Sequence, residues 1–552
     1  MTVQKKVMTA AEAIVSCLKR EDIHYVFCVP GESFLPVLDA LHDEESIQVI
    51  ASRHEGAAAF MAEGYAKSTL KPGVVLATRG VGAANLAIGV HTAYQDSTPM
   101  IVLLGQVHSK FRGREGFQEV DLDQFFGPIA KWAVEVRDAE RMPEIMERAI
   151  RVSQSGRPGP VVISLPEDIL PIEAEMEFRS KFYRPTPAPS QREIASVEKT
   201  LNEANRPLLI VGGGIKSAQA EEILITFAEK YSLPVLVAFR RHDAFPHQHP
   251  LFIGHLGLSV SKHIEETLQE ADTIIALGTR LSEVTTKDYT LLKDHHRLIH
   301  IDISENTLGK VYSPQIGIVA DAKEAIQSFI DLKVEKKWEE WVREKRAQYE
   351  KESTIFKEDH TIYSAIIDYV QKKIPKDTIF TNDAGNFASW LHRYYQFPLP
   401  HTYVGPTSGA MGYGLPAALG AKLAFPEKKV IALAGDGGFM MTVQELETAV
   451  RYQIPVICIV FNNNMYGTIR MHQEMHYPEK VIATDLGEVS FQKIAESVGA
   501  KGYTVQTIES FTEAFDEALQ LNTVVVIEVL TEKENITVGT TIEQIRKKAK
   551  NN

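Results

Sequence analysis

Two motifs in the last third of the chain decide its fold: Val430-Ile431-Ala432-Leu433-Ala434-Gly435-Asp436-Gly437, and Val456–Phe461 followed by Asn462-Asn463-Asn464. Short apolar runs that end in turn residues predict buried strands of a parallel sheet. The carboxyl ends of parallel strands meet at one edge, where doubly wound α/β folds bind their ligands. The two motifs therefore predict an α/β fold with a polar site at that edge.

The same alternation of apolar runs and helical patterns recurs along all 552 residues, which are too many for one core. It predicts three doubly wound parallel-sheet α/β domains, over residues 1–172, 190–335 and 355–535. In the first two domains we expect strands at Ile23–Val29, Val74–Ala77, Met100–Leu104, Val161–Ser164, the run after Pro207, Val235–Ala238, Thr273–Leu277 and Leu298–Ile301. Thr378–Phe380 and Val524–Val529 are further strands of the third domain.

The segments between the domains carry their own signals. Pro171–Gln191 is polar and contains four prolines, so it predicts a linker. Val334–Lys351 is heavily charged and predicts an exposed connecting helix. Two Thr-x-x-Glu patterns predict capping boxes at helix starts, one at Thr9 with Glu12 and one at Thr442 with Glu445.

The bulk composition excludes several classes of protein. A content of 44% hydrophobic and 24% charged residues is ordinary for a globular protein, and a net charge of −13 argues against nucleic-acid binding. No apolar run reaches roughly 18 residues, so we expect no membrane span. The three cysteines, Cys17, Cys28 and Cys458, form no CxxC pair, and the N-terminus lacks an apolar signal core. We therefore expect a reduced, cytoplasmic protein.

The polar motifs at the sheet edge suit a metal ion and a diphosphate. Asp436 and Asn463 offer hard oxygen ligands, and Mg²⁺ binds a few protein oxygens together with phosphate oxygens. The glycines beside Asp436 allow the backbone to approach a diphosphate closely.

With Gly-Asp-Gly and a later Asn-Asn at this spacing, the chain resembles the thiamine-diphosphate enzyme family. The resemblance implies thiamine diphosphate and Mg²⁺ as cofactors. It implies that the metal is held by Asp436, Asn463 and the backbone carbonyl of Met465. Further cofactor-binding positions implied by the resemblance are Gly31, Gly82, Asn85, Gly435, Gly437, Gly438, Tyr466 and Gly467.

Two upstream segments extend the resemblance. In the family, a glutamate at the position of Glu55, within Ser52-Arg53-His54-Glu55-Gly56-Ala57, bonds the aminopyrimidine ring and promotes deprotonation of the thiazolium carbon. In Ser408–Pro416 the carbonyl of Gly409 would accept a bond from the cofactor's amino group. Met411 would support the bent cofactor from below, a role that suits a flexible thioether.

Within this family the chain is most similar to the acetolactate synthase large subunit. The likeness rests on Arg53–Ala58, Gly80–Asn85, Tyr94–Ser97, Gly105–Val107, Gly116–Glu119, Lys131 and Gln444–Leu446. It implies that Gln118 and Lys131 line the active-site entrance. There are two departures. His472 stands where biosynthetic members carry a tryptophan that shapes the pocket for the second oxo acid, and Arg79 is an unexpected charge.

A flavin is the open question of the middle domain. Biosynthetic acetolactate synthases hold FAD partly through an Arg-Phe-Asp-Asp-Arg segment, whereas this chain reads Arg280-Leu281-Ser282-Glu283-Val284-Thr285-Thr286. Gly212-Gly213-Gly214 only approximates a dinucleotide loop. We expect a flavin-free middle domain, with FAD as the alternative.

The resemblance implies decarboxylation of a 2-oxo acid such as pyruvate, followed by ligation to a second oxo compound, as in branched-chain amino acid biosynthesis. The alternatives are a non-ligating decarboxylase, a flavin-dependent pyruvate oxidase, and a protein that keeps the fold without catalysis. Simple decarboxylases usually carry a histidine pair in the first domain, but here Ser109 follows His108. The implied assembly is a homodimer or homotetramer, with a possible small regulatory subunit.

Overall fold

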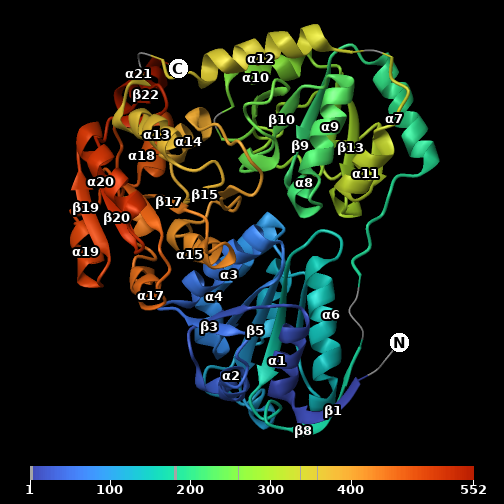
Figure 1. Ribbon diagram of the computed structural model, residues 1–552, viewed down its shortest axis with the longest axis vertical. Coiled ribbons are helices and arrows are strands. Elements are labelled where there is room, and N and C mark those ends of the chain that lie inside the picture. The colour runs from blue at the N-terminus through green and yellow to red at the C-terminus, as the bar shows by residue number, and fades with distance from the viewer. Residues whose placement is uncertain (1–3, 180–182, 259, 336, 357–358, 552) are drawn as a thin grey trace. The chain divides into compact units, whose positions relative to one another are not determined.

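A computed structural model describes residues 4–179, 183–258, 260–335, 337–356 and 359–551. The described residues form two compact units. The first lies within Met1–Arg184, Phe380–Gly385 and Val404–Lys533, and the second within Pro185–Ile379, Asn386–Tyr403 and Glu534–Asn552. Figure 1 labels the elements of both units. No helix in these described ranges combines the length and apolar character needed to cross a membrane.

The N-terminal part of the first unit is built on a six-stranded parallel sheet in the order β3-β2-β4-β5-β7-β6. Its strands are β2 (Tyr25–Cys28), β3 (Gln48–Ala51), β4 (Gly73–Ala77), β5 (Met100–Gln106), β6 (Trp132–Glu135) and β7 (Pro160–Pro166). Its helices are α1 (Ala10–Arg20), α2 (Leu35–His42), α3 (Glu55–Thr69), α4 (Arg79–Asp96), α5 (Leu122–Phe126) and α6 (Met142–Gln154). Strands β4, β5 and β7 are buried throughout, as an apolar central strand between two helical layers must be.

A second six-stranded sheet of the first unit has the order β16-β15-β17-β18-β20-β19. Its strands are β15 (Ile379–Asn382), β16 (Tyr403–Val404), β17 (Val430–Gly435), β18 (Ile457–Asn462), β19 (Lys501–Val505) and β20 (Val525–Leu530). Its helices are α15 (Gly414–Ala424), α16 (Asp436–Phe439), α17 (Glu445–Arg451), α18 (Gly467–His476), α19 (Phe491–Ser497) and α20 (Ile508–Gln520).

Helix α15 of the second sheet packs directly on α3 of the first sheet. This helix–helix contact connects the two sheets of the unit. The approach is close enough to require glycine at the contact. A Cβ atom on Gly64 would lie 2.6 Å from the carbonyl oxygen of Ala417, and one on Gly420 would lie 2.1 Å from that of Met61. Because α3 begins at Glu55, this contact fixes the helix that carries the predicted catalytic residue.

The second unit contains a six-stranded parallel sheet in the order β11-β10-β9-β12-β13-β14. Its strands are β9 (Pro207–Val211), β10 (Val235–Val237), β11 (Phe252–His255), β12 (Thr273–Leu277), β13 (Arg297–Asp302) and β14 (Ile316–Val319). Its helices are α7 (Gln191–Glu203), α8 (Gly213–Ser217), α9 (Glu221–Tyr231), α10 (Lys262–Glu270), α11 (Ala322–Phe329), α12 (Glu339–Ser353), α13 (Ile362–Lys373), α14 (Ala388–Tyr394) and α21 (Ile542–Asn551), with the hairpin β21 (Asn535–Thr537) and β22 (Thr540–Thr541).

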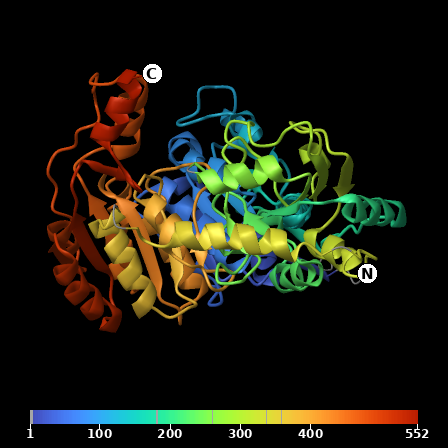
Figure 2. The same ribbon diagram turned by 90° about the horizontal axis from the view of Figure 1, so that it is seen from above.

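The predicted fold class and all the predicted strands are confirmed, but three local predictions are wrong. The supposed linker contains β8 (Glu173–Phe178), which pairs antiparallel with β1 (Gln4–Thr9). Helix α12, the long yellow helix of Figure 2, is not fully exposed, because it buries Trp341, Val342, Lys345 and Tyr349. The capping box at Thr9 forms, but the one at Thr442 does not, since α17 begins only at Glu445.

Candidate active site

The carboxyl edge of β17 and β18 brings the two polar motifs together. Gly435 pairs with Phe461, so the two polar turns leave the sheet side by side. The Asp436 carboxylate is buried, and its Oδ2 accepts a hydrogen bond from the Met465 N–H at 3.2 Å. Burial raises the pKa of Asp436, against the opposing backbone N–H groups of Gly437, Met465 and Asn464. A cation at this carboxylate would offset the cost of its burial.

The asparagines of the run 462–464 differ in their hydrogen bonds. Asn462 is structural, because its amide donates to Glu528 at 2.8 Å and its oxygen accepts from the Asn464 N–H at 3.0 Å. Asn463 is half-buried and has no hydrogen-bond partner among the described residues. Its amide oxygen therefore has no competing partner there.

These oxygens fit Mg²⁺. Nowhere in the described ranges do three His, Cys, Asp or Glu side chains gather in a way that could hold a metal. A cation at this edge would depend on the Asp436 carboxylate, the Asn463 amide, the Met465 carbonyl and phosphate oxygens, which is a donor set that Mg²⁺ accepts. The backbone beside Asp436 is tightly packed, since a Cβ on Gly437 would lie 2.6 Å from the Tyr466 ring. Gly467 opens α18 just after this ring.

Asp383, which the sequence analysis missed, supports the neighbouring segment. It is buried, and its Oδ2 accepts from the Gly412 N–H at 3.1 Å. A Cβ on Gly438 would lie 3.0 Å from the same oxygen. The sequence contained one signal for Asp383. It lies shortly after the predicted strand Thr378–Phe380, and in the structure it directly follows β15. Asp383 thereby anchors the segment that carries Gly409 and Met411, next to the glycines after β17.

Gly409 is the exposed point of that segment. Its φ of +70° belongs to the left-handed region that favours glycine, and a Cβ there would have no neighbour within 4 Å. The open surroundings are compatible with a ligand that contacts its backbone.

Glu55 lies at the first position of α3, with His54 as the N-cap. Its Oε2 accepts a hydrogen bond from the Asn85 side chain at 3.0 Å. A Cβ on Gly82 would lie 3.2 Å from the other carboxylate oxygen. The structure thus brings together three predicted residues, Glu55, Gly82 and Asn85. Gly31 follows β2 in the same domain and packs against Thr78, the residue before α4. A Cβ atom on Gly31 would lie 2.6 Å from the Cβ of Thr78.

Glu445 links α17 to the segment that precedes Glu55, in place of the predicted capping box. Its carboxylate accepts from the Arg53 N–H at 3.1 Å and from the Thr448 hydroxyl at 2.7 Å. Burial raises the pKa of Glu445 to about 7. The folded protein therefore retains a proton on this carboxyl at pH values where the unfolded chain has lost it.

We expect this carboxyl to make stability fall as pH rises. A raised folded pKa contributes stability that is fully present below the unfolded value of 4.5 and is lost as pH rises to about 7. The loss amounts to about 3 to 4 kcal/mol, at about 1.4 kcal/mol per pKa unit. Glu445→Gln should reduce the difference in unfolding free energy between pH 5 and pH 8, measured in urea. Glu447→Gln, on the same helix, is the control and should keep it. Equal pH slopes for wild type and Glu445→Gln would contradict the assignment.

The other predicted active-site residues lie as follows. The Gln118 carbonyl accepts from the Gly80 N–H at 3.0 Å. The Lys131 ammonium donates to the carbonyls of Val152 and Ser155 at the end of α6, and burial lowers its pKa to about 8. His472 is exposed on α18. The places at the active site predicted for Gln118, Lys131 and His472 stay predictions.

Arg79 is not an isolated charge. Its guanidinium forms an ion pair with Glu167 at 2.6 Å. The departure from the family pattern at this position is therefore balanced by a carboxylate within the same domain.

Family matches along the chain agree with this geometry. Residues 8–125 match the family described as thiamine pyrophosphate enzyme, N-terminal TPP binding domain. Residues 194–329 match its central domain, and residues 383–529 match its C-terminal TPP binding domain. The chain belongs to the thiamine pyrophosphate enzyme family. Asp436 lies within the matched C-terminal TPP binding domain, and the start of α3 lies within the matched N-terminal one.

Curated relatives of this thiamine pyrophosphate enzyme are similar over nearly their whole length. The probable acetolactate synthase large subunit of Methanocaldococcus jannaschii is 34% identical, over 93% of this chain and 90% of the relative. The acetolactate synthase large subunit of Haemophilus influenzae is 33% identical, over 94% and 93%. The acetolactate synthase isozyme 3 large subunit of Escherichia coli is 32% identical, over 93% of both.

Proposed function

We propose that this chain condenses two molecules of pyruvate to 2-acetolactate, with uptake of one proton and loss of one CO₂. The relatives named as acetolactate synthase large subunits support this reaction, because they match 93–94% of the chain. The observation that carries the proposal is the retained grouping of Glu55 with Asn85 and Gly82, in a chain that also keeps the buried Asp436 edge.

Thiamine diphosphate supplies, when bound, a carbon nucleophile that attacks the keto carbon and accepts the electron pair released with CO₂. The residues of the chain have the tasks of holding and protonating. Asp436, Asn463 and the Met465 carbonyl would hold Mg²⁺ together with phosphate oxygens of the cofactor. Glu55 would exchange a proton with the ring nitrogen of the aminopyrimidine, and the Gly409 carbonyl would accept a hydrogen bond from its amino group.

A product assay tests the reaction. The purified chain is given pyruvate, thiamine diphosphate and Mg²⁺, and the products are followed by NMR. We expect 2-acetolactate as the main product. Acetaldehyde alone would identify a non-ligating decarboxylase. Oxygen-dependent acetate or acetyl phosphate would identify an oxidase, and no turnover of any 2-oxo acid would indicate a protein without catalysis.

The sequence of the second unit supports a flavin-free protein, because the run from Arg280 lacks the second arginine of the flavin-binding segment and Gly212-Gly213-Gly214 only approximates a dinucleotide loop. A Cβ on Gly212 would lie 2.4 Å from the Gly278 carbonyl, and one on Gly213 would lie 2.8 Å from the Arg241 guanidinium. These contacts pack the loop closely on its neighbours, while Gly213 and Gly214 stay partly exposed. No step of the proposed reaction uses FAD. A purified protein without the flavin absorbance near 450 nm would agree with this.

The proposed assembly is a homodimer or homotetramer in the cytoplasm, with a small regulatory subunit, serving branched-chain amino acid biosynthesis. The relatives are named as large subunits, which supports a smaller partner. Exposed apolar side chains are available for contact with a second copy of the chain. In the first unit they include Val81, Ile88, Phe117, Phe125, Met440, Met441 and Ile469.

We expect His472 to make the acceptor pocket discriminate differently from a pocket with tryptophan. A change of one methylene in a pocket alters selectivity by roughly 1–3 kcal/mol, so a change of ring should be visible in competition. The measurement is the product ratio from mixed pyruvate and 2-oxobutyrate for wild type and His472→Trp. His476→Trp, one turn along the same helix, is the control. If His472→Trp leaves the ratio unchanged, His472 does not line the acceptor site.

A further inference from the structure

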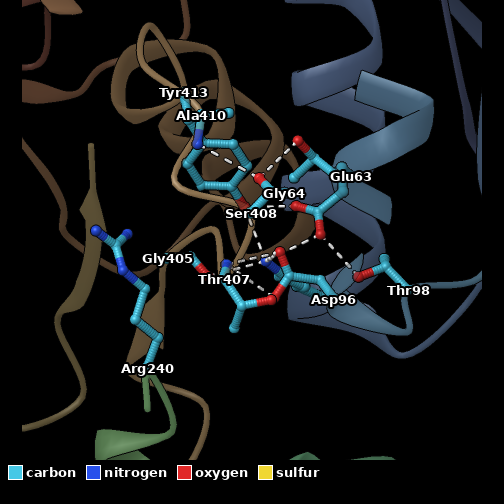
Figure 3. Close-up of polar contacts among 12 residues, drawn as sticks. Glu63, Gly64, Asp96, Thr98, Arg240, Gly405, Thr407, Ser408, Ala410 and Tyr413 are labelled. Atoms are coloured by element: carbon cyan, nitrogen blue, oxygen red, sulfur yellow. Dashed lines mark hydrogen bonds and ion pairs between the residues drawn. The ribbon is translucent and has the colours of Figure 1, made fainter. Parts of the chain in front are cut away.

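A buried group of ionisable side chains connects α3 and α4 with the segment 404–413. It consists of Glu63 and Lys67 on α3, Asp96 at the end of α4, and Tyr413. Figure 3 shows Glu63 and Asp96 on the side of the helices, facing Tyr413 and Thr407 of the segment. We call them the ion cluster. None of them belongs to the predicted cofactor or metal ligands.

Lys67 is the centre of the ion cluster. Its ammonium lies 2.9 Å from Glu63 and 3.1 Å from Asp96, whose side chains are both 0% exposed. It also donates to the Gly405 carbonyl at 3.0 Å. One cation thus bonds both carboxylates and the beginning of the segment.

The carboxylates bond the segment as well. Glu63 accepts from the Tyr413 hydroxyl at 2.5 Å and from the Thr98 hydroxyl at 2.7 Å. Asp96 accepts from the Thr407 N–H at 3.0 Å. These bonds fix both ends of the segment to α3 and α4.

The segment between these bonds has further local restraints: the Gly409 N–H donates to the Pro406 carbonyl at 3.4 Å, and the Thr442 hydroxyl donates to the Gly412 carbonyl at 2.8 Å. Ser408 shares a hydrogen bond with Thr92 on α4 at 3.0 Å, and the Gly412 N–H donates to Asp383. Gly409, which lies between them, is exposed, and a Cβ atom placed on it would have no neighbour within 4 Å. The position of Gly409 and Met411 therefore depends on the bonds at either side.

The charges explain why the arrangement is sensitive. Two carboxylates share one ammonium group, and burial raises the pKa of Glu63 while Lys67 lowers it and Asp96 raises it. Removing the cation would leave buried carboxylates without a partner, which is far more costly than losing an exposed ion pair.

We propose that the ion cluster positions the segment 404–413, so that the Gly409 backbone and the Met411 side chain are held ready for thiamine diphosphate. The four residues are positioning residues, because they act through the segment. This inference rests on the proposed function for the role of Gly409 and Met411, but the order of the segment can be measured without any ligand.

Hydrogen–deuterium exchange of the ligand-free chain tests the positioning. Lys67→Met should accelerate exchange in peptides covering 404–413 by about tenfold or more, and Tyr413→Phe by several-fold. Lys67→Arg, which keeps the charge, should restore slow exchange. The matched control is Lys345→Met, which removes a lysine that is also 0% exposed and pairs with Glu270 in the second unit. It should leave the exchange of 404–413 unchanged.

Cofactor binding provides the second readout. Calorimetry with thiamine diphosphate and Mg²⁺ should show a Kd raised about tenfold in Tyr413→Phe, which is nearly isosteric and keeps the fold, and a near-normal Kd in Lys67→Arg. If the exchange of 404–413 is the same in wild type, Lys67→Met and Tyr413→Phe, the positioning proposal is overturned. If exchange changes as expected but wild type binds no thiamine diphosphate, the proposed function fails and the positioning of the segment stands.

Discussion

Glu55→Gln is expected to lower turnover about 10²–10⁴-fold, the usual contribution of a general acid–base group. Glutamine keeps the size of the side chain and an oxygen that can accept from Asn85, which is 3.0 Å away in the wild type. What it loses is the titratable carboxyl. Folding should barely change, and cofactor affinity should fall much less than turnover, because the diphosphate and metal contacts lie at the Asp436 edge.

Proton exchange at the thiazolium carbon isolates the step that Glu55 serves. The exchange is followed by NMR in deuterated buffer, without substrate. A matched control is Glu339→Gln, which removes a carboxylate from the first position of another helix, α12. It should have no effect on exchange or turnover. If Glu55→Gln exchanges the proton as fast as wild type, another group activates the cofactor.

The sequence allowed the inner strands to be predicted because burial on both faces leaves an unbroken apolar run. Strand β12 matches its predicted range, Thr273–Leu277, and all five of its residues are buried. Two edge strands, β3 and β14, were missed because they are partly exposed and their sequences are mixed. In β3 only Ile50 is buried, and in β14 only Ile318. An edge strand is defined by its neighbour in the sheet, which a local pattern does not contain.

The site residues also differ in whether the local sequence is enough to predict them. Motifs that act locally, such as Asp436 after β17 and Glu55 at the start of α3, were recognisable from their order along the chain. Asp383 and Glu445 were not, because their partners, Gly412 and Arg53, are distant in sequence. A Thr-x-x-Glu pattern even favoured a wrong role for Glu445, since local spacing cannot reveal a tertiary acceptor.

Asp436→Ala is expected to abolish Mg²⁺-dependent binding of thiamine diphosphate, with affinity at least about 100-fold weaker. Even partners that only orient a metal ligand are worth 10–100-fold, and Asp436 is the single carboxylate of the proposed donor set. Calorimetric titration with Mg²⁺ present measures the change. Asp485→Asn is the control, because Asp485 pairs with Lys533 and lies beside Met465 without belonging to the donor set. Unchanged affinity in Asp436→Ala would remove this residue from the metal site.

Loss of binding must also be separated from loss of fold. The Asp436 carboxylate is buried and burial raises its pKa, so its charge destabilises the ligand-free protein. The melting temperature of ligand-free Asp436→Ala measures loss of fold separately, because the substitution removes this buried charge and also the acceptor of the Met465 N–H. The same variant tests whether the site is shared between subunits. If the pyrimidine contact of one subunit serves the metal edge of its partner, mixing Asp436→Ala with Glu55→Gln chains regenerates activity, since each heterodimer holds one intact site. No regained activity after verified exchange of subunits would place both halves of the site in a single chain.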